Sequence, residues 1–175
     1  MPYHGPVMAG LPPLVSVVGP SGAGKTALLE ALVRELSRRG RRVACVKHSH
    51  HRDLLPDAPG SDTHRLAQAG AAVTVLSAPG VLCLRRADGD EWPLSSVAAL
   101  AGEGLDLVLT EGYGGGPAPK VLVLRHGHPS PVLPPGLLAV VGPCPPGWSG
   151  PVFSAEQVRE LADLLEERLG LAPKG

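Results

Sequence analysis

One stretch constrains the fold of this chain more than any other: Gly19-Pro20-Ser21-Gly22-Ala23-Gly24-Lys25-Thr26. It fits the pattern G-x-x-x-x-G-K-[ST] of a phosphate-binding loop, which needs a strand before it and a helix after it. The sequence predicts both elements, because Leu14–Val18 is an apolar, β-branched run and residues 25–39 carry apolar side chains at helical spacing. The chain is therefore expected to bind the phosphates of a nucleoside triphosphate.

Each part of such a loop has a physical role. Glycines let backbone N–H groups turn toward phosphate oxygens, and the N-terminus of the following helix adds partial positive charge. Lys25 is expected to neutralise the β- and γ-phosphates, and the Thr26 hydroxyl is expected to reach Mg²⁺. The residues expected to contact the nucleotide here are Gly19, Pro20, Ser21, Gly22, Ala23, Gly24, Lys25, Thr26 and Ala27.

Apolar runs and helical segments alternate along the rest of the chain. Further strands are expected at 42–46, 105–110, 120–124 and 137–141, with two short ones at 72–76 and 81–84. Helices are expected from Ser61 or Asp62 to Gly70, at 95–101, and after a capping box at 154–157. The predicted fold class is α/β: a single P-loop NTPase domain with a mostly parallel sheet and helices on both faces. Its expected bounds are 14–170, between tails at 1–13 and 171–175.

Composition argues against several kinds of partner. The formal net charge is zero and no block of basic residues occurs, so nucleic acid is not expected as a partner. No apolar run approaches the ~20 residues of a membrane-spanning helix, and the first residues do not fit a signal peptide. Cys45 and Cys83 fall in apolar runs, where buried thiols are expected, and Cys144 lies far from both. A cytoplasmic protein is predicted.

Glu111 directly follows an apolar run that is predicted to be a strand. Ligands of open α/β sheets bind beyond the carboxyl ends of the strands. A carboxylate at this position can hold Mg²⁺ directly or through water, opposite Thr26. The alternative is an ordinary surface glutamate at a strand end. Asp106, at the start of the same strand, is expected to be structural.

A second polar segment, Lys47-His48-Ser49-His50-His51, leaves a predicted strand at the same edge. Three interpretations stay open. One is an anion or substrate site, with Lys47 as a fixed charge and imidazoles such as His48 and His50 as donors. Another is a transition-metal site that also includes His64. The last is the polar start of a loop.

The segment 57–65 combines a turn with a helix start. Asp62 or Thr63 is expected to cap that helix, and Asp57 or Asp62 can also lie near Mg²⁺ or orient a water. Arg65 either clamps a phosphate or pairs with a surface carboxylate. The candidate catalytic residues are Lys25, Asp62 and Glu111, and the candidate metal ligands are Thr26, Glu111 and Asp62.

Together these motifs resemble the molybdopterin-guanine dinucleotide biosynthesis adapter family, over roughly residues 14–168. Beyond the phosphate loop, the resemblance is carried by residues 46–51, 57–65, 69–71, 106–113 and 119–120. It implies a GTP-binding homodimer with Mg²⁺ as cofactor and, at most, a slow GTPase activity. It also implies that the protein assists molybdopterin guanylyltransferase, with molybdopterin as a further candidate ligand.

The chain departs from the usual pattern of that family in three places. Ser61 stands where lysine is usual, Tyr113-Gly114 stand where Phe-Lys is usual, and an acidic residue is absent near residues 142–144. A guanine-reading N-K-x-D motif is impossible in a chain without Asn, so the segment 142–148 is the candidate for enclosing a base through backbone groups. Guanine preference rests on the resemblance.

Two alternative functions stay open at this point. The histidines motivate a nucleotide-dependent metallochaperone of the nickel-insertion type. The strand–loop–Glu-Gly arrangement is shared with small-molecule kinases or ligases of the dethiobiotin-synthetase type.

Overall fold

The computed structural model describes residues 11–49, 57–86, 92–101, 103–127, 132–172 and 174. The chain divides into two compact units, one of residues 1–49 and 93–175 and the other of residues 50–92. The sequence predicts one domain over residues 14–170 and does not signal this division. The division arises because the strands of the segment 50–92 pair only with each other.

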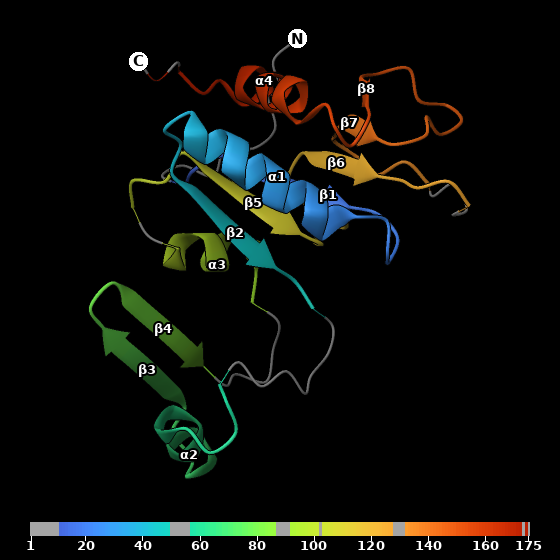
Figure 1. The fold of residues 1–175 in the computed structure, drawn as a ribbon. Helices are drawn as coiled ribbons and strands as arrows, with labels where there is room; N and C mark the ends of the chain where they lie inside the picture. The colour runs from blue at the N-terminus through green and yellow to red at the C-terminus, as the bar shows by residue number, and fades with distance from the viewer. Residues whose placement is uncertain are drawn as a thin grey trace. The chain divides into compact units, whose positions relative to one another are not determined.

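A six-stranded sheet forms the centre of the larger unit, in the order β2-β5-β1-β6-β7-β8 (Figure 1). Every neighbouring pair in it is parallel, which confirms the predicted mostly parallel sheet. The carboxyl ends of its strands therefore lie at one edge. Its strands are β1 (Leu14–Val18), β2 (Val43–Lys47), β5 (Leu107–Glu111), β6 (Lys120–Val123), β7 (Leu137–Val141) and β8 (Val152–Phe153).

Helices cover both faces of this sheet. The apolar stripes of α1 (Lys25–Arg38) and α4 (Val158–Leu169) pack into one core with the strands. The short helix α3 (Leu94–Leu100) lies on the other side of the sheet (Figure 1). The reason is handedness: β1 to β2 and β2 to β5 cross the sheet in opposite directions, and right-handed connections then place α1 and α3 on opposite faces.

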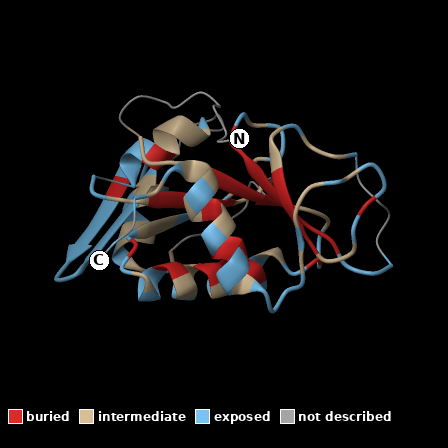
Figure 2. Ribbon diagram, turned by 90° about the horizontal axis from the view of Figure 1, so that it is seen from above, coloured by how far each residue is buried: buried red, intermediate tan, exposed pale blue. Residues whose placement is uncertain are grey.

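The buried residues follow the central strands (Figure 2). On the face away from α1 a second core contains Val18, Leu122, Leu124 and Val140, with Trp148 packed against it. The two cores explain why the strands are apolar at successive positions, since both sides of the sheet are covered.

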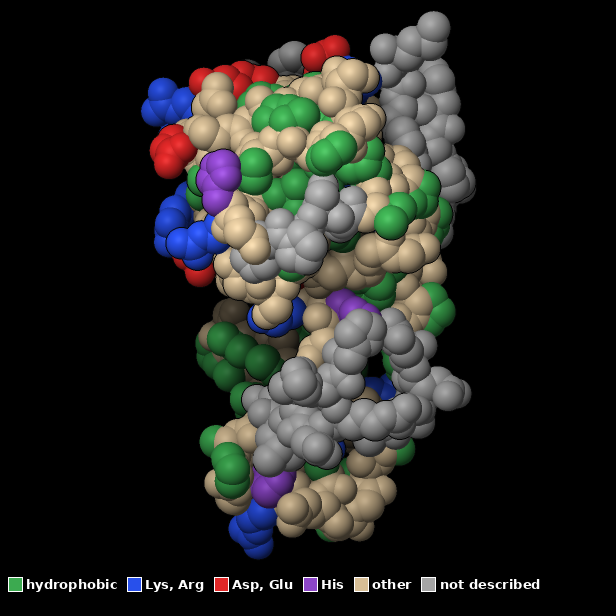
Figure 3. Space-filling model, turned by 90° about the vertical axis from the view of Figure 1, so that its right-hand side faces the viewer, with side chains coloured by type: hydrophobic (Ala, Val, Ile, Leu, Met, Phe, Trp, Pro, Cys, Tyr) green, Lys and Arg blue, Asp and Glu red, His purple; other side chains and the backbone are tan. Residues whose placement is uncertain are grey.

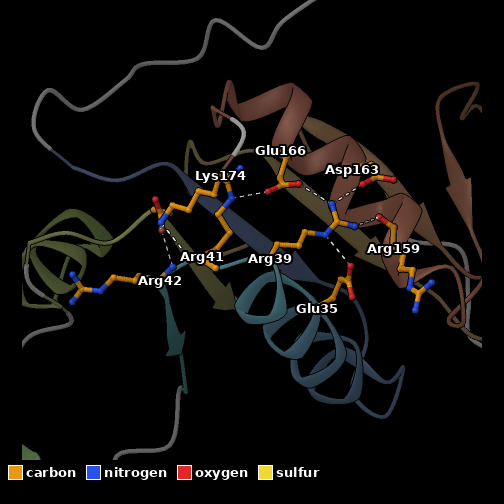
Figure 4. Close-up of polar contacts among 10 residues, drawn as sticks. Glu35, Arg39, Arg41, Arg42, Arg159, Asp163, Glu166 and Lys174 are labelled. Atoms are coloured by element: carbon orange, nitrogen blue, oxygen red, sulfur yellow. Dashed lines mark hydrogen bonds and ion pairs between the residues drawn. The ribbon is translucent and has the colours of Figure 1, made fainter.

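A cluster of ion pairs joins the C-terminal end of α1 to α4 (Figure 4). The guanidinium of Arg39 donates to carboxylates of Glu35, Asp163 and Glu166, and Arg41 donates to Glu166 at 2.6 Å. Burial raises the pKa of Glu166, but the hydrogen bonds from Arg39 and Arg41 outweigh it and leave that pKa below its usual value. This cluster lies at the opposite end of α1 from the phosphate-binding loop.

The smaller unit consists of α2 (Asp62–Gln68) and an antiparallel hairpin of β3 (Val73–Ala78) and β4 (Val81–Arg86). The sequence predicts both strands. They form a separate two-stranded sheet.

Two local predictions are wrong. Cys45 and Cys83 are exposed, because β2 is an edge strand and β4 belongs to a hairpin whose side chains are largely exposed. The last helix begins at Val158, after the predicted capping box; the side chain of Gln157 accepts from the N–H of Ser154, but this bond closes a turn before the helix. Of the residues predicted to begin or cap α2, Ser61 is the cap, because its side chain accepts from the N–H of His64; Asp62 and Thr63 lie within the helix.

Candidate functional site

The phosphate-binding loop connects β1 to α1 at the carboxyl edge of the sheet (Figure 1). Gly19 has a φ of 143°, and a Cβ there would lie 2.2 Å from the carbonyl oxygen of Val123, so only glycine fits. Gly24 precedes α1 with a φ of 99° and provides no side-chain cap. The first turn of α1 also contains no acidic residue. Its N–H groups are therefore left for an anionic ligand.

The ammonium group of Lys25 lies within the loop itself. Its Nζ donates to the carbonyl oxygen of Pro20 at 2.8 Å. This contact keeps the positive charge at the phosphate-binding loop. A phosphate oxygen is a stronger acceptor than the carbonyl, since both partners then carry charge.

Thr26 and Glu111 lie in direct contact. The Thr26 hydroxyl donates to Oε2 of Glu111 at 2.7 Å, and the pairing of Val17 with Glu111 in the sheet places the carboxylate beside the end of β1. The Nζ of Lys47 lies 3.8 Å from Oε1 of the same carboxylate. Because the Lys47 side chain is 68% exposed, this ion pair contributes little stability.

A hydroxyl and a carboxylate are the hard oxygen donors that Mg²⁺ prefers, and Mg²⁺ commonly takes one or two protein ligands together with substrate phosphates. The contact between Thr26 and Glu111 therefore fits a Mg²⁺ site beside the loop. Within the part of the chain that the structure describes, no three His, Cys, Asp or Glu side chains group as a metal site. A Mg²⁺ ion held by these two residues would need further oxygen ligands from water or a bound phosphate.

The rings of His48 and Tyr113 contact each other beside Glu111, with centroids 4.5 Å apart and ring planes tilted by 37°. The backbone N–H of His48 donates to the carbonyl oxygen of Glu111 at 2.9 Å, which extends the pairing of β2 with β5 by one residue. Gly112 makes room for this arrangement, since a Cβ there would lie 3.0 Å from Cβ of His48. Tyr113 has a φ of 54°, and among the described residues it is the one non-glycine residue with a positive φ.

Tyr113 is a candidate site residue that was assigned no role from the sequence, since it appears there only within the segment 106–113 and as a departure from the usual family pattern. The signal that points to it is its place directly after a strand end and a glycine. A positive φ costs a tyrosine free energy and is often found at functional sites.

Several predicted site residues lie outside the described part of the larger unit. His50 and His51 lie outside the described residues. Asp62 and Arg65 belong to the smaller unit, where Arg65 Nη1 lies 3.9 Å from Asp62 Oδ1 and both side chains are exposed. In the same unit Nδ1 of His64 accepts from the N–H of Gly60. The roles of Asp62 as a metal ligand and Arg65 as a phosphate clamp stay predictions.

The segment 142–148 follows β7 at the same edge, two strands from β1. Gly142 has a φ of 111°, and a Cβ there would lie 2.1 Å from the carbonyl oxygen of Leu124. Trp148 packs on the second core, and its Nε1 donates to the carbonyl oxygen of Pro151 at 3.1 Å. The segment is thus held at both ends.

The side of the molecule toward which these strands run is shown in Figure 3. In the upper part of that view, the Lys and Arg side chains gather at one margin beside Asp and Glu, and the remaining described atoms are mainly backbone and uncharged side chains. The positively charged side chains that contact the site are Lys25 and Lys47, and the N-terminus of α1 adds partial positive charge.

Known proteins that are similar to this chain share one description. The profile of the family described as molybdopterin guanine dinucleotide synthesis protein B matches residues 14–142. The molybdopterin-guanine dinucleotide biosynthesis adapter proteins of Haemophilus influenzae and Escherichia coli are each 33% identical to this chain, over 90% and 89% of it and over 89% and 92% of their own lengths. The crystal structure of Bacillus subtilis MobB is similar with a TM-score of 0.73 and 28% identity, over 89% of this chain and 97% of that one. A MobB homologue from Bacillus stearothermophilus is similar with a TM-score of 0.67 and 29% identity, over 91% and 99%.

Proposed function

The chain belongs to the family of molybdopterin guanine dinucleotide synthesis protein B, the adapters of molybdenum cofactor biosynthesis, and from this premise we propose that it binds GTP with Mg²⁺. In this proposal the GTP-bound protein supports a molybdopterin guanylyltransferase as that enzyme forms the guanine dinucleotide of the cofactor. The observation that carries the proposal is the contact between Thr26 and Glu111 beside a loop with an uncapped helix start.

The residues of the site have separate roles in this proposal. The N–H groups of Gly22 to Thr26 and the ammonium of Lys25 bind the phosphates, while Thr26 and Glu111 hold the metal ion. Mg²⁺, when bound, neutralises charge shared between the β- and γ-phosphates. Lys47 adds a positive charge on the far side of Glu111.

Hydrolysis of GTP by this site is expected to be slow. A general base must reach the attacking water with a free acceptor. In this proposal the Glu111 carboxylate is assigned to the metal ion, and the ammonium of Lys47 lies 3.8 Å from its other oxygen, so it serves poorly as that base. An adapter with a long-lived GTP-bound state fits this arrangement better than an enzyme with rapid turnover.

We also propose that the protein is a homodimer, and that β3 and β4 provide its interface. Residues 73–84 contain no charged side chain, and their exposed large apolar side chains are Val73, Val75, Leu76, Val81, Leu82 and Leu84. A two-stranded hairpin is marginally stable on its own, and an edge strand without charge is open to pairing with another chain. An apolar surface of this kind can pack against the same surface of a second copy of the chain, as in the two-fold interface of a homodimer.

The direct test has two parts, a nucleotide titration and an assay with the transferase. Calorimetric titration with GTP and ATP, with and without Mg²⁺, is expected to give tighter binding of GTP that depends on Mg²⁺. Adding the protein to a guanylyltransferase and molybdopterin is expected to increase the yield of molybdopterin guanine dinucleotide, measured by chromatography. Failure to bind either nucleotide would overturn the nucleotide assignment, and an unchanged yield would overturn the adapter role.

A further inference from the structure

Residues 112–119 connect two parallel strands without a helix. They run from β5 to β6, and β1 lies between these strands in the sheet. Connections of this kind usually contain a helix, whose internal hydrogen bonds fix its shape. Here the connection is Gly112-Tyr113-Gly114-Gly115-Gly116-Pro117-Ala118-Pro119. Such a glycine-rich segment has a large conformational entropy to lose, so something outside it must hold it in place.

Lys120, the first residue of β6, supplies these bonds. Its side chain is fully buried, at 0% exposure. Nζ donates to the carbonyl oxygens of Gly116 at 2.7 Å, Ala118 at 2.8 Å and Pro135 at 3.1 Å. The first two acceptors belong to the connection, and the third belongs to the segment that leads into β7. All three N–H bonds of the ammonium are therefore used.

The burial of this charge is costly. None of the ion pairs among the described residues includes Lys120. Burial lowers the pKa of its ammonium group, as expected for a cation surrounded by neutral carbonyls. An apolar residue could fill the same space without this cost, so the three hydrogen bonds are the reason for a lysine here.

The other end of the connection lies at the phosphate site. The N–H of Gly116, whose carbonyl binds Lys120, donates to the carbonyl oxygen of Tyr113 at 3.0 Å. The ring of Tyr113 packs against that of His48 in a tilted contact, next to Glu111. A Cβ on Gly114 would lie 3.8 Å from Val18, so the connection passes over the residue that precedes the phosphate-binding loop. A chain of contacts thus runs from Lys120 to the metal side of the site.

We propose that Lys120 is a positioning residue of the nucleotide site, which holds the connection 112–119 so that Tyr113 packs on His48 beside Glu111. The expected effect of Lys120 on nucleotide binding rests on the proposed function, whereas its expected effect on the position of Tyr113 does not. Without the three hydrogen bonds the connection loses its fixed path. Tyr113 then leaves the left-handed region, and the Glu111 carboxylate loses its fixed place near Thr26.

The test measures the stacking directly, without nucleotide. The ring of Tyr113 shifts the NMR resonances of the His48 imidazole, which are assigned by their loss in His48→Gln. Tyr113→Leu defines the unstacked position of these resonances. Lys120→Met, which keeps the length of the side chain and removes its donors, is expected to move them at least half of the way to that position. Unmoved His48 resonances in a folded Lys120→Met protein would overturn the proposal.

Two control variants separate positioning from stability. Lys174→Met removes another lysine that donates to a carbonyl, that of Gly40, at the opposite edge of the sheet. Leu165→Ala destabilises the core between α4 and the sheet. Both are expected to leave the His48 resonances in place, although Leu165→Ala lowers the melting temperature. If Leu165→Ala moves them as far as Lys120→Met does, the effect is one of stability and the proposal is wrong.

Lys120→Gln covers the case in which Lys120→Met does not fold. Its amide keeps two donors on a shorter side chain, so the His48 resonances are expected to move part of the way. Resonances that remain in place would overturn the proposal.

A second readout uses GTP: Lys120→Met is expected to weaken Mg²⁺-dependent binding about tenfold and Mg²⁺-free binding less than about threefold. Absence of GTP binding by the unaltered protein would instead contradict the proposed function, and the NMR result would stand by itself.

Discussion

The hydroxyl of Thr26 donates a 2.7 Å hydrogen bond to the carboxylate of Glu111, a residue 85 positions further along the chain. One partner is in the first turn of α1 and the other is the last residue of β5. The contact joins the phosphate-binding loop to the neighbouring strand. It also aims the Glu111 carboxylate at the loop, because the hydrogen bond occupies one of its oxygens.

Replacement of Lys25 by alanine is expected to abolish detectable binding of triphosphates and to leave the melting temperature unchanged. The ammonium contacts only a loop carbonyl among its described hydrogen bonds, so the core does not depend on it. Calorimetry measures the loss of triphosphate binding, and thermal unfolding measures the melting temperature. Arg34→Ala, an exposed cation further along the same helix, is the control and is expected to bind normally. Unimpaired binding by Lys25→Ala would contradict the assignment of the loop.

Glu111→Gln is expected to weaken Mg²⁺-dependent binding of GTP about tenfold and to change Mg²⁺-free binding less than about threefold. Glutamine still accepts from Thr26, so the change removes charge and keeps the hydrogen bond. Titrations with and without Mg²⁺ measure the difference. Equal losses under both conditions would make Glu111 a structural residue.

The double variant Lys47→Ala with His50→Ala is expected to keep GTP affinity within about threefold, or about 0.7 kcal/mol. Lys47 is largely exposed and its pairing with Glu111 is weak, so the nucleotide site retains its own charges. Formation of the guanine dinucleotide with the partner transferase is expected to fall much further. If GTP affinity collapses and the yield of the guanine dinucleotide falls only in proportion, the interpretation of residues 47–51 as a site for a further anion or substrate is wrong.

The cluster between α1 and α4 predicts a pH dependence of stability. Hydrogen bonds from Arg38 and then Arg39 lower the pKa of Glu35 from 4.5 to about 2. Because the folded pKa lies below the unfolded one, this carboxylate stabilises the fold above pH 4.5, and its contribution is lost as the pH falls toward 2. Glu35→Gln is expected to be less stable at pH 7 and to show a shallower fall in melting temperature between pH 4.5 and 2. Parallel curves for the two proteins would refute this role.

Leu82→Lys is expected to convert the protein into a monomer without loss of helical content. Leu82 is 73% exposed, so the substitution leaves the folded chain intact while placing a charge on an apolar surface. Light scattering after gel filtration measures the mass. Leu100→Lys, which alters an exposed leucine on α3, is the control and is expected to stay dimeric. A dimer that persists in Leu82→Lys would place the interface elsewhere.

The helices and strands could be predicted from the sequence because they depend on local patterns of residues. The phosphate-binding loop, the amphipathic stripes of α1 and α4 and the apolar strands are each encoded over a short span of chain. The sequence also predicted the position of Glu111 at a strand end, because Glu111 directly follows an apolar run. Family membership followed from the same local motifs and agrees with the profile match over residues 14–142.

Contacts between distant segments were decided only by the tertiary structure. The periodicity of apolar residues does not indicate the order of strands in a sheet. That order brings together three pairs of residues: Glu111 with Thr26, His48 with Tyr113, and Lys120 with Pro135. It also leaves Cys45 on an edge strand, although the apolar run around it reads as buried. The sequence thus determined which segments form strands, helices and the phosphate loop, because hydrogen bonding and amphipathicity act over a few residues. The structure determined which side chains meet, because strand pairing is a long-range choice that depends on how the whole core is filled.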